Sequence, residues 1–194
     1  VGDFVRLYLT RFNRWRSPVY LAGESYGTAR AVGLIEYLHR QHGIALSGIA
    51  LISPVLDFNT ISFNPSNDLP YLLFLPTYAA AARYHAKAAG EAPLEQVLQD
   101  VERWAVTDYA AALSQGAMLG DSDRRAVAMQ AGAYAGLPPE YVAKNNLRVR
   151  PERFRKELLR ERGLVIGRMD ARMTMPDTDA ASDAAASDPS LDRL

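Results

Sequence analysis

The chain contains no cysteine and carries no formal net charge. Without cysteine it cannot form disulfides, use a thiolate nucleophile or bind a metal through cysteine, although this absence does not fix the redox compartment. The 22 lysine and arginine residues balance 22 aspartate and glutamate residues, so no basic excess predicts binding to nucleic acid or to an anionic membrane. No motif indicates a metal or another cofactor, and we expect none.

The sequence also lacks a long apolar run. Its most apolar stretch, Leu69–Ala82, is interrupted by Pro70 and Pro76 and is too short to span a bilayer. We expect this stretch to be buried structure or the wall of a pocket. The N-terminus, Val1–Arg6, lacks the basic and apolar regions of a signal peptide. The sequence leaves the compartment and the oligomeric state open.

The first sixty residues alternate between helical and strand patterns. Apolar spacing predicts helices over Asp3–Trp15 and Thr28–Arg40. Each is followed by an apolar run without polar alternation, Val19–Ala22 and Ser47–Ser53. Such runs are typical of parallel strands that are buried on both faces. The sequence therefore predicts an α/β fold with a parallel sheet.

After Pro54 the pattern changes. Asp57–Pro70 is rich in Asn, Ser, Asp and Pro and is predicted to be a loop. From Leu72 to about Leu159 we find helical patterns and no convincing strand. The helices expected there cover Tyr78–Ala89, Pro93–Ala112, Asp121–Ala133, a short segment from Pro138 and a segment from Pro151 to Gly163.

These patterns divide the chain into three parts. We expect residues 1–60 to form a partial α/β core and residues 61–163 to form a helical insertion. Residues 164–194 are expected to contain a short strand, Leu164–Gly167, and a tail. From Pro176 onward the tail is mainly Asp, Ala, Ser and Pro, with almost nothing to bury. We therefore expect it to be largely disordered.

A sharp glycine-rich turn separates the first predicted strand from the second predicted helix. It reads Gly23-Glu24-Ser25-Tyr26-Gly27 and matches G-x-S-x-G, the nucleophile elbow of α/β-hydrolases. The turn places the serine in a strained backbone conformation, and side chains at the two glycines would collide with the adjoining strand and helix. The backbone N–H of Tyr26 could then stabilise the oxyanion of an acyl-transfer intermediate. The alternative is an ordinary turn whose serine has no chemical role.

The segment from Gly23 to Gly27 resembles the active-site segment of the serine carboxypeptidases, which have Gly-Glu-Ser-Tyr followed by small residues. Thr28 stands where many members of that family have glycine. The loop Ser53–Asp57 is similar in placement to the family's loop after the next strand, and the helical insertion is similar to its cap. Three further segments look like bacterial members: Asn145–Val149, Gly167–Arg172 and Asp188–Ser190. The resemblance covers nearly the whole chain and implies a partial α/β-hydrolase with an inserted helical cap.

The resemblance implies a serine-type carboxypeptidase, which removes C-terminal residues from peptides. Export of the full-length protein, to the periplasm or the medium, is one option for the compartment, which stays open. Ser25 would be the nucleophile, and the Tyr26 N–H would be a donor of the oxyanion hole. Glu24 would bind the free C-terminal carboxylate of the peptide substrate. Two carboxyl groups share a hydrogen bond only when one is protonated, so such a site works best in acid. Without the resemblance, Glu24 would be interpreted as a solvated residue.

A serine nucleophile also needs an imidazole base that an acid orients, and in this fold the chain order is Ser, Asp, His. His39 and His42 stand at the far end of the helix that the serine begins, roughly 20 Å away. We expect them to be surface residues. His85 follows Asp57 and Asp68 in the chain, but it lies in the helical insertion rather than after a later strand. We expect it to be a residue of a cap helix.

The aspartate and histidine of the triad are therefore expected outside these 194 residues, which would be an internal piece of a longer enzyme or a truncated gene product. Three functions stay open at this point. The first is a serine carboxypeptidase. The second is a related esterase or acyltransferase, with another substrate or acceptor. The third is a catalytically inactive fragment that acts only as a binding module.

Overall fold

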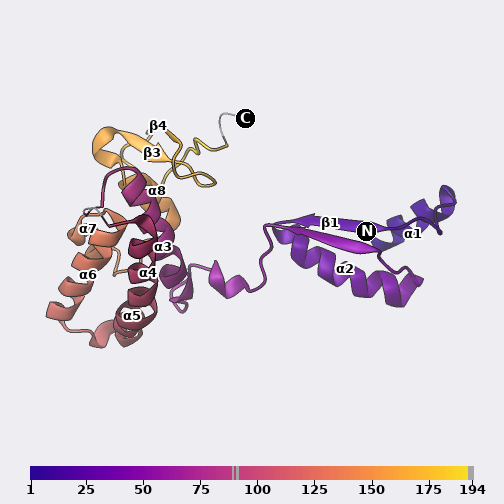
Figure 1. Ribbon diagram of the computed structural model, residues 1–194, viewed down its shortest axis with the longest axis horizontal. Coiled ribbons are helices and arrows are strands. Elements are labelled where there is room, and N and C mark those ends of the chain that lie inside the picture. Colours follow the sequence, from indigo (N-terminus) through magenta and orange to yellow (C-terminus); the bar gives the residue numbers. More distant parts are fainter. Residues whose placement is uncertain (89, 91, 192–194) are drawn as a thin grey trace. The chain divides into compact units, whose positions relative to one another are not determined.

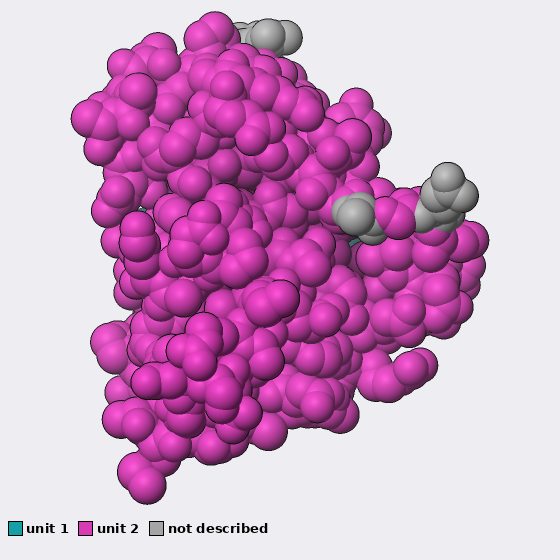
Figure 2. Space-filling model, turned by 90° about the vertical axis from the view of Figure 1, so that its left-hand side faces the viewer, with its two compact units in different colours: residues 1–58 teal, residues 59–194 magenta. Residues whose placement is uncertain are grey.

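The structure is a computed structural model that describes residues 1–88, 90 and 92–191. The chain forms two compact units, Val1–Phe58 (unit 1) and Asn59–Leu194 (unit 2). Figure 1 shows their elements, and Figure 2 shows the closely packed surface of unit 2 in magenta. Helices outweigh strands, and the described part of each unit contains one two-stranded sheet. The protein is therefore of mixed α/β class.

Unit 1 is a strand–helix–strand arrangement preceded by a helix. Its elements are α1 (Gly2–Arg11), β1 (Tyr20–Glu24), α2 (Tyr26–His42) and β2 (Gly48–Ile52). The two strands are parallel, with Tyr20 opposite Gly48 and Glu24 opposite Ile52. The helix α2 connects them and packs along the pair (Figure 1). The parallel pairing that the two apolar runs predict is confirmed.

The two strands are more exposed than the sequence predicts. Tyr20, Ile49 and Ile52 have exposed fractions of 72%, 47% and 52%. The expectation of two fully buried strands is therefore wrong for unit 1. Successive side chains of a strand point to opposite faces of the sheet. Among the described elements of unit 1, α2 packs on one of these faces, and Tyr20 and Ile52 belong to the other. Ile49 lies on the face of α2, where it lines a hollow with Ile35 and His39.

The first helix is shorter than the predicted Asp3–Trp15 and ends at Arg11. Asn13 has a φ of 53°, in the left-handed region that terminates helices. Aromatic side chains of α1 remain exposed, and the rings of Tyr8 and Phe12 lie 4.7 Å apart between centroids. The small core of unit 1 consists of Leu9, Leu38 and Ile44.

Unit 2 is mainly helical. Its helices are α3 (Leu69–Tyr84), α4 (Leu94–Trp104), α5 (Ala110–Gln115), α6 (Asp121–Ala135), α7 (Pro139–Lys144) and α8 (Pro151–Glu157). Single turns of 3₁₀ helix lie at Phe58–Thr60, Gly116–Met118 and Arg160–Arg162. The antiparallel strands β3 (Leu164–Ile166) and β4 (Thr174–Pro176) follow. The helix α3 packs against α4 and α6, and it contributes more residues to the core than any other described element.

Two predicted helices have different bounds in the structure. The helix expected over Tyr78–Ala89 is the second half of α3 and ends at Tyr84, and Ala89 lies outside the described residues. The helix expected over Pro93–Ala112 contains a π-helical segment, Ala105–Tyr109, between α4 and α5. An apolar periodicity predicts that a helix exists more reliably than it predicts where the helix ends or widens.

The most apolar run of the sequence forms α3. Pro70 lies in its first turn, where a missing N–H costs nothing, and Pro76 lies inside it. Tyr78 is buried, its ring stacks on that of Phe154 at 4.0 Å, and its hydroxyl donates to a backbone carbonyl. Phe74 and Tyr78 also line a hollow of about 330 Å³. The run is thus both buried structure and the wall of a hollow.

The C-terminal segment makes several polar contacts with the rest of unit 2. In its described part, up to residue 191, three basic side chains bind it to α8 and the turn that follows. Arg155 donates to the Ser187 carbonyl at 2.8 Å, and Lys156 Nζ lies 2.5 Å from the Asp177 carboxylate. Arg160 donates to the carbonyl of Ala180 at 3.0 Å. In the structure these polar contacts connect the tail to the rest of unit 2.

Candidate active site

Ser25 occupies the single residue between β1 and α2. Its φ of 52° and ψ of −122° lie in a region that residues with a side chain rarely adopt. Its N–H donates to the carbonyl of Ile52 at 3.0 Å, which extends the pairing of the two strands by one residue. The serine is therefore held in a strained conformation by the sheet on one side and by the helix on the other.

The glycine before the serine is required by a close approach of two backbone segments. A Cβ atom added to Gly23 would lie 2.4 Å from the carbonyl oxygen of Gly27, at the start of α2. At Gly27 itself a Cβ atom would meet nothing within 4 Å. The expected collision is therefore found at Gly23, whereas the expectation for Gly27 is wrong within the described residues.

We predict that Gly23→Ala destabilises the elbow by about 3 kcal/mol, because the new methyl group would push β1 away from α2. Gly27→Ala is the matched control and should stabilise α2 by about 0.5–1 kcal/mol, since alanine is the better helix former. Hydrogen exchange of the β1 and α2 amides in the full chain measures both effects. Equal protection in the two variants would contradict the close packing of Gly23.

Thr28 was not predicted to have a role in the site. It is buried, with 2% of its surface exposed, and its hydroxyl donates to the Ser25 carbonyl at 2.6 Å. Its backbone N–H donates to the same oxygen at 3.0 Å. Thr28 thereby fixes the peptide unit after the serine. The sequence signal for this role is a hydroxyl residue three positions after a turn residue, a spacing that suits local bonds to the backbone.

The three predicted site residues, Glu24, Ser25 and Tyr26, are consecutive and exposed. Tyr26 is the first residue of α2, so its N–H has no acceptor within the helix. The positive end of the helix dipole lies at the same place and favours a developing negative charge. The Tyr26 ring lies 6.1 Å from the ring of Phe58, and the guanidinium of Arg30 lies 5.7 Å from its centroid. One turn therefore presents a hydroxyl, a carboxyl group and an N–H donor to solvent.

The structure brings neither histidine of unit 1 to the serine. His39 and His42 lie in the last turn of α2, roughly 20 Å or more along the helix from Ser25. The Nε2 atom of His42 lies 3.1 Å from a carboxylate oxygen of Asp3. Both residues are therefore at the helix end opposite to the elbow.

His85 belongs to unit 2, where it directly follows α3. Its Nε2 lies 2.7 Å from the carbonyl oxygen of Ala171, so this nitrogen carries a proton and donates it there. Asp68, one of the two aspartates that precede it, accepts a bidentate pair of hydrogen bonds from Arg148 at 2.6 and 2.8 Å. The described contacts of His85 are thus those of a structural residue.

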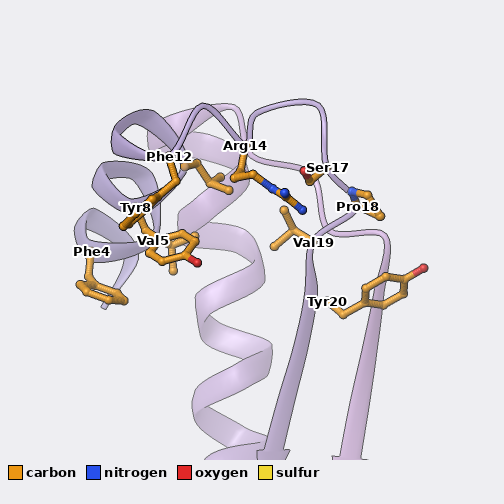
Figure 3. A pocket seen from close by; sticks show the side chains of 10 residues that line it. Phe4, Val5, Tyr8, Phe12, Arg14, Ser17, Pro18, Val19 and Tyr20 are labelled. Atoms are coloured by element: carbon orange, nitrogen blue, oxygen red, sulfur yellow. The ribbon is translucent and has the colours of Figure 1, made fainter.

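A hollow of about 680 Å³ lies in unit 1 between α1 and the start of β1. Figure 3 shows Tyr8 of α1 and Phe12, which follows this helix, on one side of it, with Val19 and Tyr20 on the other. It lies at the beginning of β1, whereas Ser25 follows the end of that strand. This hollow is therefore separate from the elbow.

Comparisons of the chain with protein-family models, curated proteins and solved structures found no match. The residues 1–88, 90 and 92–191 contain no group of three or more His, Asp or Glu side chains that could hold a metal ion. None of the described helices combines the length and apolarity that are needed to cross a membrane. The candidate site therefore rests on the geometry of the elbow.

Proposed function

We propose that this chain carries the nucleophile elbow of an α/β-hydrolase of the serine carboxypeptidase type. The observation that carries the proposal is the backbone of Ser25, which has a positive φ between a parallel strand and a helix N-terminus. A serine gains nothing structurally from this conformation, which costs about 1–3 kcal/mol. Strain of this kind at an exposed hydroxyl is typical of a catalytic position.

In the proposed reaction, Ser25 Oγ forms a bond to the carbonyl carbon of the last peptide bond. The Tyr26 N–H donates to the oxygen that becomes negatively charged. The C–N bond then breaks, and the C-terminal amino acid leaves with the proton that the serine lost. Water hydrolyses the resulting ester and restores the serine. A partial α/β-hydrolase core in unit 1, with unit 2 as the helical cap, is the arrangement that this proposal assigns to the chain.

The proposal needs an imidazole base, which none of the three described histidines supplies in its present contacts. We propose that the base and its aspartate come from polypeptide outside these 194 residues. The same observation favours a second candidate, an inactive binding module that retains the elbow. An esterase or acyltransferase would use the same serine on a substrate without a free carboxylate.

The test uses the protein expressed from its complete reading frame. A carboxypeptidase releases the C-terminal residue from an N-blocked dipeptide at mildly acid pH, whereas an esterase acts on the methyl ester of the same dipeptide and leaves the free acid intact. An inactive module acts on neither. Turnover of the ester alone would reject the peptidase proposal and would identify the protein as an esterase.

Glu24 is proposed to bind the substrate carboxylate. We therefore predict that Glu24→Gln slows hydrolysis of the free acid much more than hydrolysis of the ester. Loss of a charge-assisted hydrogen bond should lower kcat/KM for the free acid by about 10- to 100-fold. The ester, which has no carboxylate, should change by less than about threefold, since it loses no such bond. The acid preference of peptide hydrolysis should also weaken, because the shared proton is lost.

The matched control is Glu36→Gln, which removes an exposed carboxylate of α2 that pairs with Arg40 at 3.0 Å. Peptide and ester hydrolysis should both stay at wild-type rates in this variant. Equal losses on the two substrates in Glu24→Gln would assign a structural role to Glu24 and would contradict carboxylate binding.

A further inference from the structure

A hollow of about 790 Å³ in unit 2 has a lining rich in arginine. It lies between the loop before α3, the start of α6 and the segment from the end of α7 into α8. Its ten lining residues include four arginines and no acidic residue: Pro65, Tyr71, Gly116, Ala117, Arg124, Asn145, Asn146, Arg148, Arg150 and Arg153. The volume is within the range of small-molecule sites.

Arg148 is the most firmly held of the four arginines. Its guanidinium binds both carboxylate oxygens of Asp68 at 2.6 and 2.8 Å and donates to the Leu113 carbonyl at 3.0 Å. Its side chain is 17% exposed. The hydrogen bond to Asp68 raises the pKa of Arg148 above its usual value, so the group stays charged. The contacts fix the position of this cation at the edge of the hollow.

The amide acceptors of the lining are already used by two other arginines. Arg124 donates to the side-chain oxygen of Asn146 at 2.6 Å and to the Gly116 carbonyl at 3.2 Å. Arg153 donates to the side-chain oxygen of Asn145. Because these side-chain oxygens are engaged, the arginines and the tyrosine hydroxyl leave the side-chain lining of the hollow richer in donors than in acceptors. Such a surface suits a ligand that only accepts hydrogen bonds.

Arg150 differs from the other three. It directly precedes α8, it is exposed, and its side chain has no hydrogen bond or ion pair among the described residues. Two of the four guanidinium groups form ion pairs: that of Arg148 with Asp68, and that of Arg153 with Asp183 at 3.6 Å. Within residues 1–88, 90 and 92–191, no carboxylate forms an ion pair with Arg124 or Arg150. The hollow therefore keeps a positive excess, which anions would neutralise.

We propose that this hollow binds a small anion that carries two or more phosphate or carboxylate groups. The planar guanidinium fork pairs with two oxygens of such a group, and the fork of Arg150 is the one that no described acceptor occupies. Arg124 and Arg153 are positioned beside it by the asparagine side chains, whereas the fork of Arg148 already binds a carboxylate. The site is separate from Ser25 and does not depend on the function proposed for that residue.

The experiment measures binding of pyrophosphate and of citrate to the full chain by titration calorimetry, at a fixed ionic strength of about 0.15 M to screen non-specific attraction. Tighter binding of pyrophosphate assigns the site to phosphate-bearing ligands, and tighter binding of citrate assigns it to polycarboxylates. Binding of neither anion would overturn the proposal.

Arg150→Ala should raise the dissociation constant of the preferred anion by about tenfold or more, because a charge-assisted hydrogen bond is lost. The matched control is Arg125→Ala, which removes an exposed arginine adjacent to Arg124 that does not line the hollow. It should change binding by less than about twofold, as a screened distant charge does. Equal weakening in both variants would show attraction by net charge alone and would refute the site.

The melting temperature of Arg150→Ala should equal that of the wild type, since its side chain makes no described hydrogen bond or ion pair, and Arg150→Gln provides a second variant.

Discussion

Ser25→Ala is expected to abolish peptide hydrolysis in the protein expressed from its complete reading frame. The loss in kcat should be about 10⁴-fold or more, because no other group can form the acyl-enzyme. The fold should not change, since the side chain is exposed and alanine keeps the same Cβ atom. Hydrolysis of a blocked dipeptide and circular dichroism measure the two effects. Substrate binding should persist, because the rest of the site stays in place.

Two further variants distinguish the loss of the nucleophile from the effect of backbone strain at position 25. Ser25→Gly should be equally inactive, yet more stable than Ser25→Ala by about 1 kcal/mol, because glycine tolerates a φ of 52°. Ser53→Ala is the control, since Ser53 is exposed, has a φ of 48° and ends the neighbouring strand without a helix after it. It should keep the wild-type rate. Residual turnover in Ser25→Ala, or its loss in Ser53→Ala, would place the nucleophile elsewhere.

Lys156→Met is expected to destabilise unit 2 by about 3 kcal/mol, the low end of the range for breaking a buried ion pair. The Lys156 side chain is fully buried, and its Nζ lies 2.5 Å from the Asp177 carboxylate, whose side chain is 8% exposed. Nζ also donates to the backbone carbonyl of Asp179. Removal of the lysine leaves a covered carboxylate without its cation. Denaturant unfolding measures the loss.

The controls distinguish the ion pair from a general effect of lysine removal. Lys144→Met replaces an exposed lysine of α7 and should change stability by less than about 0.5 kcal/mol. The double variant Lys156→Met with Asp177→Leu should recover most of the loss, because no unpaired charge then stays covered. A double variant as unstable as Lys156→Met would contradict this explanation.

The same pair predicts a pH dependence. The Lys156 ammonium lowers the pKa of Asp177 below its ordinary value of 3.8. A carboxyl group whose pKa is lowered by folding stabilises the fold above its unfolded pKa, and this stabilisation is lost as the pH falls through the folded value. The wild type should therefore lose stability below about pH 4. In Lys156→Met this loss should be smaller, since Asp177 no longer has its cation.

Local chemistry allowed the elbow to be predicted from the sequence. Glycines two positions before and after a serine, between an apolar strand and a helical pattern, predict a sharp turn, and the structure places Ser25 there with a positive φ. The pairing of β1 with β2 follows from the strand–helix–strand order. These features depend on neighbours in the chain, which the sequence displays directly.

Other features depend on contacts between distant residues. The exposure of Tyr20 and Ile52 reflects what packs on the sheet, which apolar composition does not reveal. The polar contacts of the tail up to residue 191 involve cations of α8 such as Arg155 and Lys156. The arginine-lined hollow gathers residues from Pro65 to Arg153. No short sequence pattern predicts such contacts between distant residues.

The central claim is that the turn at Ser25 presents a catalytic nucleophile. The most direct measurement is covalent labelling with a fluorophosphonate, followed by mass spectrometry of the peptides, on the protein expressed from its complete reading frame. The expected result is one adduct, on Ser25, which is absent in Ser25→Ala and present in Ser53→Ala. An unlabelled protein, or an adduct on any other serine, would contradict the claim.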